Sequence, residues 1–138
     1  MANEAVIIEL LGKVPGTPVR YTVGAATAIP KGTLLKISDP RTVEATSADN
    51  DAFAGIAAEE HDTTSGSTSM SVYTSGIFDL LTTDAAANVA AGERVSIADA
   101  NTISKVAAPD LLFSDVGVAL ETATNNVAEV IAVKLGGF

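Results

Sequence analysis

The residues best suited to chemistry in this chain lie together in the run Glu59-Glu60-His61-Asp62. Serine-type catalysis needs a base that orients and deprotonates the hydroxyl, and His61 is the only histidine of the sequence. A zinc site needs three or four converging protein ligands, whereas consecutive residues of a strand point to opposite faces. We therefore expect these four residues to form the solvated end of a hairpin rather than a catalytic or metal site.

Other patterns that carry chemistry are missing from the sequence. The chain has no cysteine, which excludes a thiol nucleophile, a disulfide framework and a cysteine-rich zinc site. The acidic residues are scattered, without the aromatic platform that a sugar site would use, and mostly occupy turns where Asp is favoured. No glycine-rich phosphate motif occurs. We expect no enzymatic activity, no catalytic residue, no metal and no cofactor.

The charge balance bears on the partners of the protein. The formal net charge is -9, from 17 acidic and 8 basic residues, and the basic residues form no patch. Nucleic-acid surfaces need clustered Lys and Arg, so we expect no nucleic-acid partner. An acidic surface favours solubility or docking onto a basic partner. The apolar run 5–11 is too short to span a bilayer, so we expect no membrane partner and synthesis in a cytosol.

The elements that would position any site come from a repeat of about 60 residues. The repeated positions are glycines, small residues and apolar residues, so what is repeated is a way of folding and not a reaction centre. The block 55–59 matches 117–121 two residues further along, which indicates a local slip. The other matched pairs include Thr22 and Thr82, Gly32 and Gly92, Ile37 and Ile97, Asp39 and Asp99, Phe53 and Phe113, and Gly76 and Gly136.

Each half of the repeat reads as β-structure. Residues 19–23 alternate apolar and polar side chains, the period of a half-buried strand. Pro30 and Gly32 predict a turn before a strand that ends at Asp39-Pro40, and a second strand begins at Thr42, which is the pattern of a hairpin. The second half repeats this pattern at 89–103. The segment 63–69 has no apolar anchor, so we expect it to be an exposed hairpin tip.

These patterns predict an all-β fold, a small barrel or sandwich with at most a short helical turn in the Ala-rich segment 84–91. The expected organisation is an N-terminal arm, 1–18, and one β domain, 19–138, whose halves are about 19–78 and 79–138. The predicted core consists of Val23, Leu35, Ile37, Phe53, Ile56, Val95, Ile97, Phe113, Val118 and Ile131.

The N-terminal arm allows two interpretations. It is either the first edge strand of the domain or an apolar arm that lies on a neighbouring subunit. Glycine and proline residues from 12 to 18 break any regular element that follows it. The second interpretation rests on the position of the apolar segment outside the repeat, where no repeated element is available to bury it.

Seven segments of the chain share an informative order and spacing: residues 19–23, 29–37, 55–57, 75–80, 91–95, 117–121 and 127–135. Together they resemble a known family, the capsid cement or head decoration proteins of tailed phages. The resemblance covers about residues 18–135, and its order and spacing are more specific than any single motif. It implies a compact β-rich fold like that of the lambdoid decoration protein, with no catalytic residues.

The resemblance also implies a function and partners. The protein would be a viral structural protein on the outer surface of the virion, made in the host cytoplasm. It would bind the phage head at capsomer junctions as a homotrimer and stabilise it against internal DNA pressure. Its partners would be the major capsid protein and further copies of itself. The apolar arm would make the contact, through Val6, Ile7, Ile8, Leu10 and Leu11.

Alternative functions from other classes stay open at the level of sequence. One is a phage tail or spike β module, which would copurify with tails rather than with heads. A carbohydrate-binding β domain is disfavoured because the chain has no Trp. A small hydrolase would depend on His61.

Overall fold

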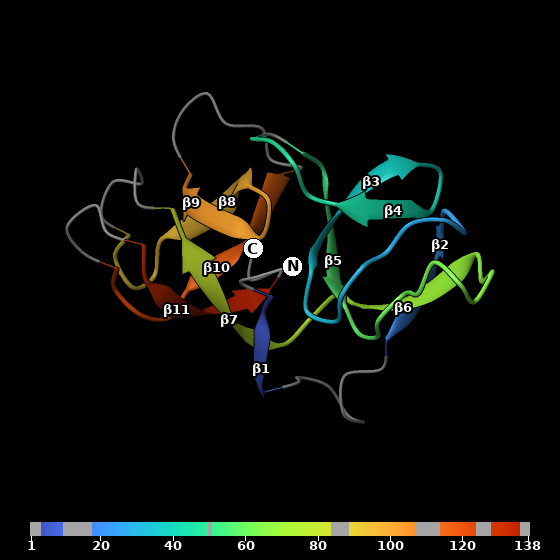
Figure 1. The fold of residues 1–138 in the computed structure, drawn as a ribbon. Coiled ribbons are helices and arrows are strands. Elements are labelled where there is room, and N and C mark those ends of the chain that lie inside the picture. The colour runs from blue at the N-terminus through green and yellow to red at the C-terminus, as the bar shows by residue number, and fades with distance from the viewer. Residues whose placement is uncertain are drawn as a thin grey trace.

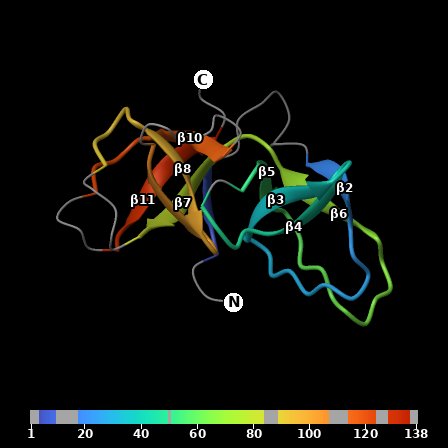
Figure 2. The same cartoon turned by 90° about the horizontal axis from the view of Figure 1, so that it is seen from above.

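Two five-stranded β-barrels lie side by side in this protein (Figures 1 and 2). The computed structural model describes residues 4–9, 18–49, 51–83, 89–106, 114–123 and 128–135, with the backbone alone for residues 8 and 9. The predicted all-β fold class is confirmed. Residues 84–88 of the predicted helical turn, as well as Phe113, Gly136 and Phe138, lie outside the described residues.

The first barrel, called barrel 1, is formed by the first half of the repeat. Its strand order is β2-β4-β3-β5-β6, with β6 closing onto β2. The pair β2 and β4 is parallel, and the other pairs are antiparallel. Its strands are β2 (Val19–Val23), β3 (Leu34–Asp39), β4 (Thr42–Ala45), β5 (Phe53–Ala57) and β6 (Ser69–Tyr73).

The second barrel, called barrel 2, has the same connections. The pair β7 and β9 is parallel, as its counterpart is in barrel 1. An additional strand, β1 (Val6–Glu9), pairs with β7 at the edge of this sheet. The predicted division between residues 78 and 79 falls within β7. The strands of barrel 2 are β7 (Ile77–Thr82), β8 (Arg94–Asp99), β9 (Thr102–Lys105), β10 (Asp115–Ala119) and β11 (Val130–Leu135).

The repeat extends to the backbone conformation of the turns. The hairpin turns after β3 and β8 place Arg41 and Asn101 at positive φ, 49° and 55°. Gly32 and Gly92, which precede these hairpins, have φ of 89° and 94°. Such values are unusual for a residue with a side chain. The predicted hairpins therefore form, and each uses the same local geometry in both halves.

In the first strand of each half, β2 and β7, the strand pairing differs by one residue from the repeat alignment predicted from the sequence. Thr22 pairs with Thr42, and Leu81 pairs with Thr102, the equivalent of Thr42. Leu81 is therefore the structural counterpart of Thr22, whereas the sequence alignment matched Thr22 with Thr82. The difference matters because side chains alternate in direction, so that a shift of one residue exchanges inward for outward positions.

The predicted slip in the middle of the repeat is real. Gly55 pairs with Leu35 of β3, and Gly117 pairs with Val95 of β8, which is the equivalent of Leu35 in the repeat. By the same pairing, the counterpart of Phe53 is Asp115, which pairs with β8 where Phe53 pairs with β3. The alignment of Phe53 with Phe113 was therefore wrong for this strand.

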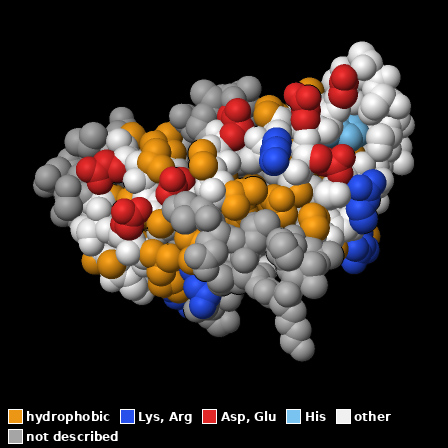
Figure 3. All heavy atoms as spheres, turned by 90° about the horizontal axis from the view of Figure 1, so that it is seen from below, with side chains coloured by type: hydrophobic (Ala, Val, Ile, Leu, Met, Phe, Trp, Pro, Cys, Tyr) orange, Lys and Arg blue, Asp and Glu red, His pale blue; other side chains and the backbone are white. Residues whose placement is uncertain are grey.

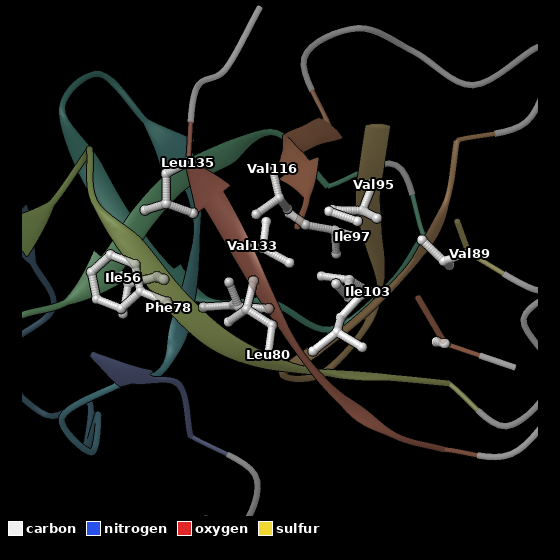
Figure 4. Close-up of a cluster of buried hydrophobic side chains, with 14 residues drawn as sticks. Ile56, Phe78, Leu80, Val89, Val95, Ile97, Ile103, Val116, Val133 and Leu135 are labelled. Atoms are coloured by element: carbon white, nitrogen blue, oxygen red, sulfur yellow. The ribbon is translucent and has the colours of Figure 1, made fainter. Parts of the chain in front are cut away.

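The apolar core is continuous from one barrel into the other. Barrel 1 encloses a small cluster of buried residues. The larger cluster fills barrel 2 and also includes Leu34 and Ile56 of barrel 1 (Figure 4). Tyr73 of barrel 1 packs its ring 5.7 Å from that of Phe78 in barrel 2. The smaller cluster consists of Val23, Ile29, Leu35, Val43, Ala57, Met70 and Val72.

The predicted core is largely confirmed. Ile37 was wrong, because its side chain is 37% exposed whereas its counterpart Ile97 is fully buried. Ile37 lies at a register shift near the end of β3, beyond the small cluster of barrel 1. Phe53 and Val118 are only partly buried. The confirmed core residues are Val23, Leu35, Ile56, Val95, Ile97 and Ile131.

Hydrogen bonds also join the two barrels. The buried side chain of Asn101, in the turn after β8, accepts from the Leu34 backbone N–H at 2.8 Å. Thr46 of barrel 1 accepts from the Asn101 N–H at 3.2 Å. Strand β1 adds a further link, because Ala5 donates to the Gly32 carbonyl of barrel 1 at 2.6 Å while β1 itself pairs with barrel 2. We expect the barrels to behave as one body.

Candidate interaction surface

The predicted arm forms an edge strand within its own chain. Val6 lies opposite Asp79, and Ile7 lies opposite Phe78, in an antiparallel pair between β1 and β7. The Val6 side chain is 59% exposed, whereas Ile7 packs against the core of barrel 2. The Ile8 side chain, Leu10 and Leu11 lie outside the described residues. A contact between these five residues and another protein stays a prediction.

Beside Val6 lies an exposed apolar face of barrel 2. Strand pairing places Val6, Asp79 and Ala132 in one row and Leu81 and Val130 in the next. Because residues directly opposite each other in a sheet point the same way, all five side chains share one side. We call this set the barrel-2 outer face. Val6 and Val130 are 59% and 60% exposed, Asp79 and Leu81 are partly buried, and Ala132 is buried beneath them. Figure 3 shows hydrophobic side chains on the barrel-2 side of the molecule, with carboxylates among them.

The equivalent face of barrel 1 is polar. Its four positions on β2 and β6 are Arg20, Thr22, Ser69 and Ser71, by the pairing of these strands. The Arg20 guanidinium donates to Ser69 at 2.6 Å, to Ser71 at 3.0 Å and to the carboxylate of Glu59 at 3.2 Å. Hydrogen bonds from Ser71, together with the charge of Arg20, hold the pKa of Glu59 below its ordinary value. This face is well suited to contact with water.

His61 is buried and lies between two backbone carbonyls. The prediction of a solvated hairpin end was wrong for this residue, which is only 3% exposed. Its ring nitrogens face two carbonyl oxygens: Nδ1 is 2.6 Å from that of Thr27, and Nε2 is 2.7 Å from that of Ser67. The imidazole thereby connects the loop before Ile29 to the loop after Asp62. The residue types alone did not reveal this role, because both partners are backbone atoms.

Replacing His61 with alanine should lower the free energy of unfolding by about 1–3 kcal/mol, because a buried carbonyl loses the imidazole N–H that donates to it and the packed ring is removed. Ala123 occupies the corresponding β-bridge in barrel 2, so alanine is compatible with the backbone. Urea denaturation measures the change, and Glu60→Ala, at an exposed neighbour, is the control. Equal stability of the two variants would show that the imidazole contacts contribute nothing.

The described part of the chain offers little else that could form a site. It contains no group of three or more His, Asp or Glu side chains that could hold a metal ion. It also contains no helix long and apolar enough to cross a membrane. The surfaces of β1 and of the barrel-2 outer face are therefore the features that most invite a functional explanation.

Comparison with known protein families gives a match over most of the chain. A family model described as phage cement protein matches residues 14–135. The match takes in both barrels completely and begins after β1. No curated protein matches the chain.

Proposed function

Since the chain belongs to the phage cement protein family, a structural role on the phage capsid is the premise, and we propose how it is carried out. The protein binds the outside of the phage head at junctions between capsomers. There it holds neighbouring capsid subunits together against the outward pressure of the packaged DNA. The observation that carries this proposal is the family match over both barrels.

The architecture supports a mechanical role. The core runs from barrel 2 into barrel 1 through Leu34 and Ile56, so a load applied to one barrel is transmitted to the other through packed side chains. The backbone bonds of the closed barrels leave few free strand edges. A body of this kind can bridge two capsid subunits without bending at a linker.

Binding at a junction gains affinity from several contacts at once. In a homotrimer, attachment of one subunit raises the effective concentration of the other two at their sites. The N-terminal segment, with Val6, Ile7, Ile8, Leu10 and Leu11, is the proposed contact with the major capsid protein or a neighbouring copy. β1 offers its outer edge for strand addition, and the exposed Val6 side chain adds apolar contact. The net charge of -9 suits a basic partner surface.

Electron cryomicroscopy tests the proposal directly. Heads assembled without this protein are incubated with the purified chain and imaged beside untreated heads. We expect additional density with threefold symmetry on the outer shell. Heads that stay bare at saturating protein would overturn the capsid-binding proposal, and density at another symmetry position would overturn the proposed trimer.

A further inference from the structure

The two barrels provide an internal comparison, because the same fold carries different side chains at equivalent outward positions. On barrel 1, Leu34 is buried and Phe53 is partly buried, and both belong to or pack against the core of barrel 2. The equivalent positions on barrel 2 are Arg94 and Asp115, which form an ion pair with each other. At these two positions, therefore, the side chains are apolar in barrel 1, where they pack against the core of barrel 2, and charged in barrel 2.

The barrel-2 outer face shows the same replacement without a neighbouring barrel to cover it. Where barrel 1 has polar side chains at the equivalent positions, barrel 2 has Leu81, Val130 and Ala132. The fold does not require apolar residues there, because barrel 1 closes with polar ones. Val130 and the adjacent Val6 are nonetheless the two most exposed of the large apolar side chains described. An apolar face of this kind is typical of a surface that is buried in a complex. The polar equivalents are Thr22, Ser69 and Ser71.

The charges of the barrel-2 outer face indicate what kind of partner covers it. Glu121 accepts the Ala132 N–H at 2.7 Å, as Glu59 accepts the Ser71 N–H at 2.7 Å. Barrel 1 neutralises Glu59 with Arg20. At the position of Arg20, however, barrel 2 has Asp79.

Asp79 of the face and the neighbouring Glu121 are therefore two carboxylates where barrel 1 has an ion pair. Among the described residues, neither Asp79 nor Glu121 takes part in an ion pair. Lys134, on the same side of β11, is exposed and is not within ion-pair distance of either. The apolar centre and its acidic neighbours match a partner that is apolar in the middle and carries a cationic side chain.

We propose that the barrel-2 outer face is the surface by which this protein docks onto the capsid shell. The partner surface is apolar opposite Leu81 and Val130, and it supplies an Arg or Lys to Asp79 and Glu121, as Arg20 does within barrel 1. The inference rests on the proposed capsid-binding function and assigns that function to one face. A second copy presenting the same face would bring like charges together, which disfavours self-association through it.

Exchanging residues between the equivalent faces tests the proposal. Leu81→Thr with Val130→Ser installs the residues of barrel 1, and Asp79→Arg installs its cation. The control, Thr22→Ala with Ser69→Ala, truncates the corresponding positions of barrel 1. Binding is measured by cosedimentation with heads assembled without this protein, and circular dichroism with thermal melting confirms that each variant is folded.

We expect both barrel-2 variants to bind heads at least about tenfold more weakly than the unmodified protein, while the control changes by less than about twofold. Asp79→Arg should also reduce the salt dependence of the remaining binding. Unchanged binding of the barrel-2 variants, with the unmodified protein bound, would overturn the assignment of this face but not the proposed function.

Two other outcomes would overturn the proposal differently. If the unmodified protein does not bind heads, the proposed function fails and this inference fails with it. Sedimentation-velocity measurements on the same variants detect self-association. Loss of an oligomer in the barrel-2 variants, with head binding retained, would assign the face to a second copy of the chain.

Discussion

Replacing Gly117 with alanine should destabilise the protein by about 3 kcal/mol or more. Gly117 lies in β10, which pairs with β11. A Cβ atom there would collide with the carbonyl oxygen of Lys134, and it would lie 2.8 Å from the carbonyl carbon and 3.0 Å from the Cα of Leu135. These atoms are backbone, and β11 is held on its other side by β7. The strand therefore cannot move away without losing hydrogen bonds.

Gly66→Ala is the matched control for this substitution. Gly66 has φ of +70°, and no atom lies within 4 Å of an added Cβ, so alanine there should cost only about 1–2 kcal/mol of backbone strain. Urea denaturation of both variants gives the two free energies of unfolding. A Gly117→Ala variant no less stable than Gly66→Ala would show that β10 and β11 are less closely packed than the structure indicates.

Replacing Phe78 with alanine should cost about 3–5 kcal/mol, the usual loss when a buried phenylalanine is truncated. Phe78 is fully buried in β7, and it belongs to the cluster that also holds Leu34 and Ile56 of barrel 1. It also contacts the ring of Tyr73. Because this contact region belongs to both barrels, we expect the Phe78→Ala variant to unfold in one transition, at a lower temperature than the unmodified protein.

Differential scanning calorimetry checks this expectation, since a single cooperative unit gives equal calorimetric and van't Hoff enthalpies. Val130→Ala, at an exposed position, is the control and should change stability by no more than about 0.5 kcal/mol. Two transitions, with one at the original temperature, would contradict the prediction. They would mean that barrel 1 folds independently of barrel 2.

The sequence predicted the local features of this fold well. Asp39-Pro40 and the turn residues Pro30 and Gly32 correctly indicated the first hairpin and its entry. Such features depend on residues close together in the chain, whose conformational preferences act directly on the backbone. The fold class followed from the same short-range patterns, repeated in both halves.

The features that the sequence did not predict depend on distant contacts. The burial of His61 depends on backbone carbonyls of two loops. Every residue has such a carbonyl, so the sequence does not show which ones the imidazole will contact. Ile37 and Ile97 have the same side chain in matched positions, but only Ile97 is covered by a larger core. The contrast between Arg20 and Asp79 depends on the register of the paired strands, which differs by one residue from the alignment of the repeat in sequence.

Strand β1 also has a consequence for the order in which the protein is made. Its partner residues are Asp79, Phe78 and Ile77, so β1 leaves the ribosome before all the strands of barrel 1 and cannot pair with β7 until they have followed. Barrel 1, whose strands lie between 19 and 73, can close before then. Until barrel 2 is complete, however, Leu34 and Ile56 have no cover. The attachment of β1 thus becomes possible only after the strands of barrel 1 have been made, while the surface that we propose for the capsid is still being formed.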